Sequence, residues 1–181
     1  GKRRVLGCGN LGTMDAFGAF RDAPLRLPAE MAEIIADPYR FPFVDKVLSV
    51  HERQSLTTQT TLSVALHPFL SDHAIEGVPY HPGVMALEMF AENALLLRPS
   101  ACLAGFEKVS FGLPVKLMKG AMTVRIHAEL IRSDGEMSWI ECRLLSDLKN
   151  SKGEHFGERE HHKAIVRVVE RREDLGPFLQ S

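Results

Sequence analysis

Hydrophobic and polar positions alternate along much of the chain, and one long apolar run interrupts the alternation. Residues 41–50 are mainly apolar, and residues 55–66 alternate and are rich in threonine, so both segments predict strands. From residue 83 to residue 97 nearly every position is apolar, and Arg98-Pro99 ends this run. Apolar residues on all sides of a helix predict that it is buried.

The second half of the chain has the pattern of an antiparallel sheet. Residues 121–131 alternate closely, and a turn at 133–135 leads into a further strand at 138–145. A polar loop at 150–157 then precedes a last strand at 164–169. One buried helix followed by an antiparallel meander predicts an α+β fold.

The first part of the chain carries no periodic core signal. Glycine and proline recur in residues 1–38, so we expect a leader segment with a short helix at 29–36, followed by a domain over 39–181. Residues 7–12 match the dinucleotide fingerprint G-x-G-x-x-G. Only Val5-Leu6 precedes them as an apolar run and no βαβ unit follows, so we interpret the match as a flexible linker.

Composition and charge exclude several classes of protein. The 181 residues are 45% hydrophobic with a formal net charge of −1, which suits one globular domain and gives no reason to expect nucleic acid binding. Cys8, Cys102 and Cys142 lie far apart without a C-x2-C pattern, so we expect neither disulfides nor zinc, as suits a reducing cytoplasm. No run approaches the ~20 apolar residues of a membrane span, so we expect a soluble protein.

The segment from His73 to Gly83 places a titratable imidazole just ahead of the expected helix. Proline at position 82 suits the first turn of a helix, and Gly83 lets a ligand approach backbone N–H groups closely. The intrinsic pKa of histidine is near neutrality, so His73 is suited to acid–base chemistry.

His73, Gly77 and Pro82 form the spacing H-x3-G-x4-P, which resembles the active-site motif of polyketide synthase dehydratase domains. Residues 39–48 are similar to the opening strand of the stand-alone β-hydroxyacyl carrier-protein dehydratases of fatty-acid synthesis, whose motif is one residue shorter. Both groups share the hotdog fold, an antiparallel sheet wrapped around one long central helix. The resemblance therefore implies this fold.

The resemblance also implies a reaction, namely the dehydration of 3-hydroxyacyl thioesters to trans-2-enoyl thioesters without a cofactor. It assigns His73 as the base for the proton next to the carbonyl, and the Gly83 N–H as the group that polarises the thioester oxygen. Gly77 and Pro82 shape the turn and the helix entry. His81 stands where the family usually has an apolar residue, so it either lines the substrate tunnel or is a partly exposed loop side chain. The substrate arrives on the phosphopantetheine of an acyl carrier protein.

The acid that assists departure of the hydroxyl has two candidates. Glu88 falls where the fatty-acid dehydratases carry their acidic partner, which is supplied across a dimer, and on an apolar helix its pKa should be raised. Polyketide dehydratase domains instead take a catalytic aspartate from a second hotdog half. The chain is therefore either a homodimer or one half of a larger domain excised from a multidomain synthase, which a start at Gly1 suits. Glu92 either extends a polar stripe or binds a backbone group.

Two other interpretations of the whole chain stay open. One is a hotdog thioesterase, which needs a carboxylate to activate water and leaves the motif at 73–82 unexplained. The other is a non-catalytic half-domain that acts as a structural partner. Two further groups of residues are expected to be structural. The first is a solvated loop that enters an edge strand and holds no metal (His155, Glu158, Glu160, His161 and His162). The second consists of aromatic core residues (Phe106, Phe111 and Trp139).

Overall fold

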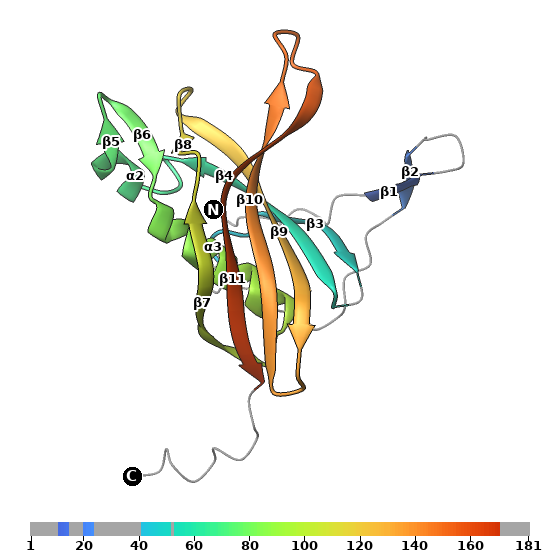
Figure 1. Ribbon diagram of the computed structural model, residues 1–181. Coiled ribbons are helices and arrows are strands. Elements are labelled where there is room, and N and C mark those ends of the chain that lie inside the picture. Colours follow the sequence, from blue (N-terminus) through green and yellow to red (C-terminus); the bar gives the residue numbers. More distant parts are fainter. Residues whose placement is uncertain (1–10, 15–19, 24–40, 52, 171–181) are drawn as a thin grey trace, which may run out of the picture.

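The computed structural model describes residues 11–14, 20–23, 41–51 and 53–170. Its main feature is a six-stranded antiparallel sheet in the order β3-β4-β9-β10-β11-β7 (Figure 1). In chain order these strands are β3 (Lys46–His51), β4 (Ser55–Ser63), β7 (Ala101–Phe111), β9 (Ala121–Ser133), β10 (Met137–Lys149) and β11 (His155–Glu170).

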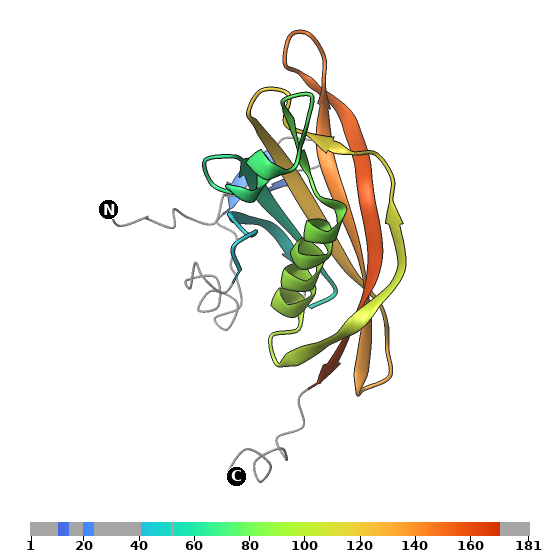
Figure 2. The same ribbon diagram turned by 90° about the vertical axis from the view of Figure 1, so that its left-hand side faces the viewer.

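The sheet curves around one long helix, α3 (Gly83–Leu97), which lies along its concave face (Figure 2). The buried apolar side chains of the helix pack against those of the sheet, among them Leu56, Ile126, Ile140 and Val166. The helix bounds agree with those expected from the apolar run. One helix on an antiparallel sheet confirms the predicted α+β fold.

A smaller structure stands at the end of the sheet near the start of α3. It consists of a short helix, α2 (Phe69–Asp72), and a three-stranded sheet in the order β5-β6-β8 (Figure 1). These strands are β5 (Ala74–Ile75), β6 (Val78–His81) and β8 (Val115–Lys116).

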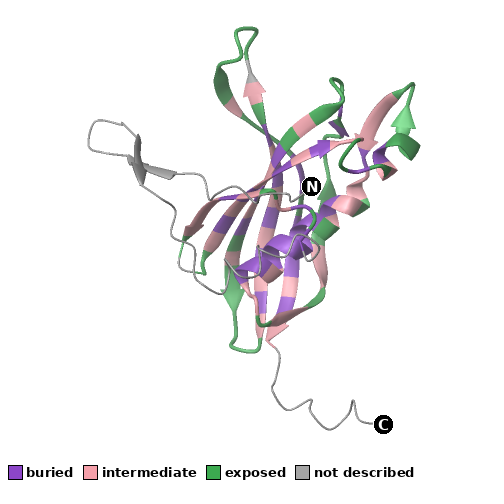
Figure 3. Ribbon diagram, turned by 180° about the vertical axis from the view of Figure 1, so that it is seen from behind, coloured by how far each residue is buried: buried purple, intermediate pink, exposed green. Residues whose placement is uncertain are grey.

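The helix α3 is enclosed along only part of its length (Figure 3). From Met89 to Leu97 every residue except Leu95 is buried, whereas from Gly83 to Glu88 only Ala86 is buried. Val84 is 67% exposed. The prediction of a helix buried on all sides therefore holds only for its second half, and the first half has a side that the described residues leave open.

The last strand differs from the expectation in extent and position. β11 begins at His155, inside the expected polar loop, and lies between β10 and β7 rather than at the edge of the sheet. Its first residues belong to a hairpin with β10 that projects beyond the core (Figure 1), where both faces of a strand meet water. Such a strand carries no apolar alternation, which is why the sequence pattern did not show it.

Buried polar side chains attach the second half of α3 to the strands beside it. The hydroxyl of Thr58 donates to Oδ1 of Asn93 over 2.7 Å, and Nδ2 of Asn93 donates to the carbonyl of Met89. The N–H of Phe43 donates to Oε2 of Glu92 over 2.9 Å. Glu92 therefore binds a backbone group, one of its two expected roles.

Several expectations concern the first residues of the chain. The expected helix at 29–36 and Cys8 lie outside the described residues. Within residues 7–12, Leu11 begins β1 (Leu11–Met14), which pairs with β2 (Phe20–Ala23), whereas a dinucleotide fingerprint would open a helix there. Among the described residues, Cys102 and Cys142 form no disulfide, and none of the helices has the length and hydrophobicity needed to cross a bilayer.

The contact between Thr58 and Asn93 predicts a measurable coupling. We expect Asn93→Leu and Thr58→Val each to lower the free energy of unfolding by about 1–3 kcal/mol, because each leaves a buried partner without a hydrogen bond. The double variant should lower the free energy of unfolding by about 1–2 kcal/mol less than the two single variants together, because no buried partner is then left without a hydrogen bond. Urea unfolding of the four proteins checks this, and strictly additive costs would contradict it.

Candidate functional site

A tight hairpin sets the position of the first candidate residue. β5 and β6 are joined by Glu76 and Gly77, whose φ angles are +50° and +77°, as a two-residue type I′ turn requires. A Cβ at position 77 would meet no atom within 4 Å, so the glycine is needed for its backbone conformation and not for space. This agrees with the shaping role expected of Gly77.

His73 lies directly after α2 and faces the second strand of the hairpin. Its backbone carbonyl accepts the N–H of Tyr80, and its ring Nδ1 lies 2.9 Å from the carbonyl oxygen of Tyr80. A carbonyl only accepts hydrogen bonds, so Nδ1 carries the proton and the lone pair of the neutral ring is on Nε2. The side chain is exposed, so Nε2 is available to abstract a proton.

The start of α3 supplies uncompensated backbone donors. Pro82 (φ −62°, ψ 135°) is the capping residue and Gly83 is the first helical residue, so Pro82 stands directly before the first turn rather than within it. No side chain caps this end and its first turn holds no acidic residue, so the N–H groups and the positive end of the helix dipole are not neutralised locally.

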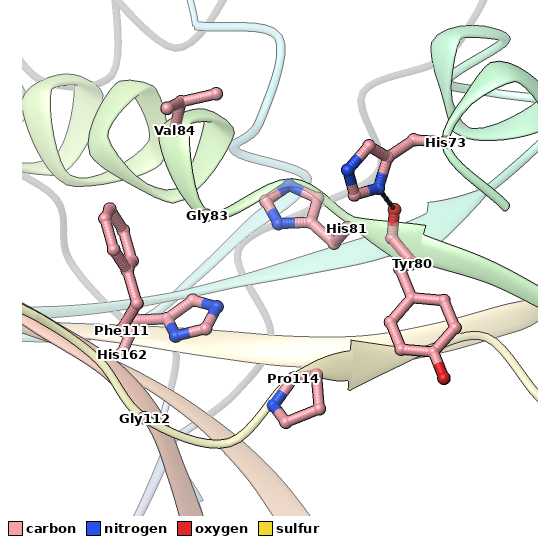
Figure 4. A pocket seen from close by; sticks show the side chains of 9 residues that line it. All are labelled: His73, Tyr80, His81, Gly83, Val84, Phe111, Gly112, Pro114 and His162. Atoms are coloured by element: carbon pink, nitrogen blue, oxygen red, sulfur yellow. Dashed lines mark hydrogen bonds between the residues drawn. The ribbon is translucent and has the colours of Figure 1, made fainter. Parts of the chain in front are cut away.

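These parts meet in a pocket of about 360 Å³ (Figure 4). Three of the predicted site residues line it, namely His73, His81 and Gly83. Glu88, Gly77 and Pro82 do not, so the last two act through backbone shape alone. The full lining consists of His73, Tyr80, His81, Gly83, Val84, Phe111, Gly112, Pro114 and His162.

Two of the pocket histidines are buried, contrary to expectation. His81 is 4% exposed, so it lines the pocket and is not the partly exposed loop side chain of the alternative interpretation. Burial, reinforced by the neighbouring histidines His162, His67 and His73, lowers its pKa to about 4. His162 is 5% exposed and lies on β11, so the assignment of this segment to a solvated loop was wrong. Burial lowers the pKa of His162 as well.

A bulge explains why the sequence did not reveal that His161 is buried next to His162. Leu144 pairs with His162 and Leu145 with Glu160, so His161 is an extra residue without a partner in the register. Adjacent residues of a regular strand face opposite sides, but here both rings are buried. His161 hydrogen-bonds Ser146 Oγ and the carbonyl of Leu113. No sequence signal marks the bulge.

Phe111 is also placed differently from the expectation. It ends the edge strand β7 and is 50% exposed at the pocket, rather than buried in the core. A Cβ at position 83 would lie 2.8 Å from its ring, so the absence of a side chain on Gly83 admits this ring beside the helix start. The other two aromatic residues, Phe106 and Trp139, are half-buried in the sheet.

The carboxyl groups are distributed differently from the expectation. Glu88 is exposed, whereas we expected its carboxyl group to be buried among apolar residues. The buried carboxyl is that of Glu92, whose pKa burial raises to about 8 despite the opposing hydrogen bond from Phe43. No carboxyl group of the described residues lines the pocket, and none of their histidines, cysteines and acids form a group of three able to hold a metal.

The fold and the pocket define a hotdog-fold domain with a histidine and a helix N-terminus at its pocket. Residues 41–143, more than half of the chain, match the polyketide synthase dehydratase domain family, and the chain belongs to this family.

Comparison with individual proteins agrees with this assignment. The chain is 39% identical over 62 residues to the 3-hydroxyacyl-acyl-carrier-protein dehydratase FabZ of Polynucleobacter necessarius. The match covers 33% of this chain and spans 40% of the length of that relative.

Solved structures show the same fold at low sequence identity. The dehydratase heterocomplex ApeI:P from Xenorhabdus doucetiae has a TM-score of 0.52 at 18% identity, over 82% of this chain and 89% of that chain. The dehydratase domain from the CurF module of curacin polyketide synthase has a TM-score of 0.55 at 13% identity, over 74% of this chain and 45% of that chain. A hypothetical thioesterase with coenzyme A from Streptococcus pneumoniae has a TM-score of 0.53 at 12% identity, over 78% of this chain and 96% of that chain. The predicted hotdog fold is confirmed.

The buried carboxyl of Glu92 predicts a pH-dependent stability. Its pKa is raised from 4.5 to about 8 in the folded protein, so the folded state keeps a proton that the unfolded state has lost. Stability from this group is present below pH 4.5 and is lost as the pH rises towards 8.

We expect Glu92→Gln to keep the hydrogen bond from the N–H of Phe43. The substitution should also remove the loss of stability with rising pH, which amounts to as much as about 4 kcal/mol of unfolding free energy. Urea unfolding at about pH 5 and about pH 8.5 compares the two proteins. Glu88→Gln, a change of the exposed glutamate one helical turn away, is the control. It should change the pH dependence of the unfolding free energy far less. An equal pH slope in wild type and Glu92→Gln would contradict the prediction.

Proposed function

We propose that this domain dehydrates 3-hydroxyacyl thioesters, carried on an acyl carrier protein in the cytoplasm, to trans-2-enoyl thioesters. The observation that supports this best is the meeting of His73, with its lone pair on Nε2, and the free N–H groups at Gly83 in one pocket. A base and a donor for a developing oxyanion are two of the three groups that the elimination requires.

The chemistry follows from these two groups. Nε2 of His73 removes the proton from the carbon next to the thioester carbonyl, while the Gly83 N–H and the helix dipole stabilise the negative charge that develops on the carbonyl oxygen. The carbon–carbon double bond then forms, the bond to the 3-hydroxyl breaks, and the hydroxyl leaves as water after receiving a proton. The carbonyl of Tyr80 holds the His73 ring in place and stabilises its positive charge once it is doubly protonated.

The third group, an acid for the leaving hydroxyl, is not supplied by any described residue that lines the pocket. Glu88 follows Val84 by one helical turn, on the side of α3 that is open to solvent, and Val84 lines the pocket. A second hotdog domain that covers this side would complete the site, either with Glu88 of another copy or with an acid of its own.

Exposed apolar groups on the same side support such pairing. The edge strand β7 presents Leu103 (44% exposed) and Val109 (41%), and the chain after it presents Leu113 (52%). An open strand edge with apolar side chains is suited to another chain. The similarity to a dehydratase heterocomplex and the 45% coverage of the CurF dehydratase domain agree with two hotdog units per site.

A non-catalytic half-domain is the second candidate, and the lack of a carboxyl group among the described pocket residues favours it. The same observation argues against a thioesterase, because hydrolysis in that class needs a carboxylate that activates water. Similarity to a hypothetical thioesterase at 12% identity concerns the fold alone.

The role of His73 predicts the effect of its removal. We expect His73→Ala to lower kcat/KM for 3-hydroxyacyl-pantetheine thioesters by about 100- to 10,000-fold, because a positioned general base is lost. The thermal midpoint should stay unchanged, since the side chain is exposed. His155→Gln, a change of an exposed histidine on the projecting hairpin, is the matched control and should keep full activity. Retained activity in His73→Ala would refute the assignment.

Mixing two variants tests the origin of the acid. If Glu88 acts across a homodimer, Glu88→Gln is inactive, and mixing it with His73→Ala restores roughly a quarter of wild-type activity, because half of the dimers are mixed and each has one intact site. The mixture is assayed after unfolding and joint refolding, with the mass in solution recorded. A dimer without any recovery would refute the composite site. A folded but inert wild type would instead favour the half-domain.

A further inference from the structure

His81 and His162 are the two buried polar side chains of the pocket that the proposed mechanism does not use. Within the described part of the chain, none of their four ring nitrogens has a partner at hydrogen-bond geometry, although the two side chains are only 4% and 5% exposed. Buried polar groups in folded proteins almost always have partners, and His161 beside them has one for each ring nitrogen. The two unsatisfied rings therefore call for a partner that the chain itself does not supply.

The two rings belong to strands far apart in the sequence but line the same pocket. His81 ends β6 just before the helix start, and His162 lies on β11 (Figure 4). A charge on His162 would act on His81, which shows that the rings are neighbours. The ring of Phe111 packs edge-to-face on His162 at 5.5 Å between centroids and is half exposed.

The chemistry of the two rings limits what they can bind. Burial keeps both imidazoles neutral at neutral pH, so neither supplies the positive charge that a carboxylate would need. A neutral imidazole has one donor and one acceptor, and so has a hydroxyl group. The other contacts of His81 are with the aromatic rings of Phe43 and Phe69, which compete for no hydrogen bond.

We propose that His81 and His162 bind a hydroxyl group on the acyl chain beyond the reacting carbons, so that the preferred substrates are polyhydroxylated rather than simple 3-hydroxyacyl chains. This inference rests on the proposed function, because it assigns the substrate class of the same pocket. Specificity arises because a chain without the second oxygen leaves both buried rings unpaired, whereas a hydroxyl group can accept a hydrogen bond from one ring and donate one to the other.

The test compares matched pantetheine thioesters with and without one extra hydroxyl, placed at the fifth or the seventh carbon. We expect wild type to prefer one of the hydroxylated thioesters by about tenfold or more in kcat/KM, mainly through KM. His81→Val and His162→Leu should abolish the preference, whereas His162→Gln, which keeps a donor and an acceptor, should retain part of it. His155→Gln should leave the preference unchanged.

A second measurement separates failure of this inference from failure of the proposed function. Pantetheine amides of the same chains, without the 3-hydroxyl, cannot be dehydrated, and their binding to wild type is measured by calorimetry. Tighter binding of a hydroxylated amide supports the inference even if neither thioester is turned over, in which case only the proposed function fails. Equal binding of all amides, or equal turnover of all thioesters, would overturn the inference. The ring nitrogens would then have buried water as their hydrogen-bond partner. Because wild type alone decides these outcomes, a variant that fails to fold does not affect them.

Discussion

The burial of the second half of α3 in the curve of the sheet is the constraint on which the other features depend. From Met89 onward the helix fills the concave face, and Asn93 and Glu92 attach it to Thr58 and to the backbone of Phe43. An apolar helix anchored at one end in this way has a fixed direction. Its other end, at Gly83, is therefore held at the pocket with its N–H groups unoccupied by any capping side chain.

The geometry of the base depends on a second, local constraint. The hairpin turn at Glu76 and Gly77 returns the chain so that the carbonyl of Tyr80 faces the ring of His73. One hydrogen bond thereby determines both the orientation of the ring and the nitrogen that can accept a proton. The backbone of the same hairpin leads through Pro82 into Gly83, so one short segment places the base and the oxyanion donor relative to each other.

The pocket combines polar chemistry with low charge. Its buried histidines are neutral, its exposed histidine is the proposed base, and the carboxyl group at Glu88 lies outside it on an open helix face. The open face and the edge strand β7 share one character, since both are apolar and both lack a covering layer from the described chain. Completion of the site and coverage of this surface are thus one structural requirement, which a second hotdog unit would satisfy.

The sequence alone determined the α+β class, the bounds of the central helix, the family and the segment that holds His73 and Gly83, because these follow from local periodicity and local spacing. Tertiary structure decided the surroundings of each polar group. Glu88 and Glu92 are one helical turn apart on the same apolar run, yet only Glu92 is enclosed by other strands, and this burial raises its pKa. His162 lies on the same face of β11 as the buried Ala164 and Val166, but its place in the pocket depends on contacts with distant segments, and burial of this kind is a sum over distant contacts that no local pattern contains.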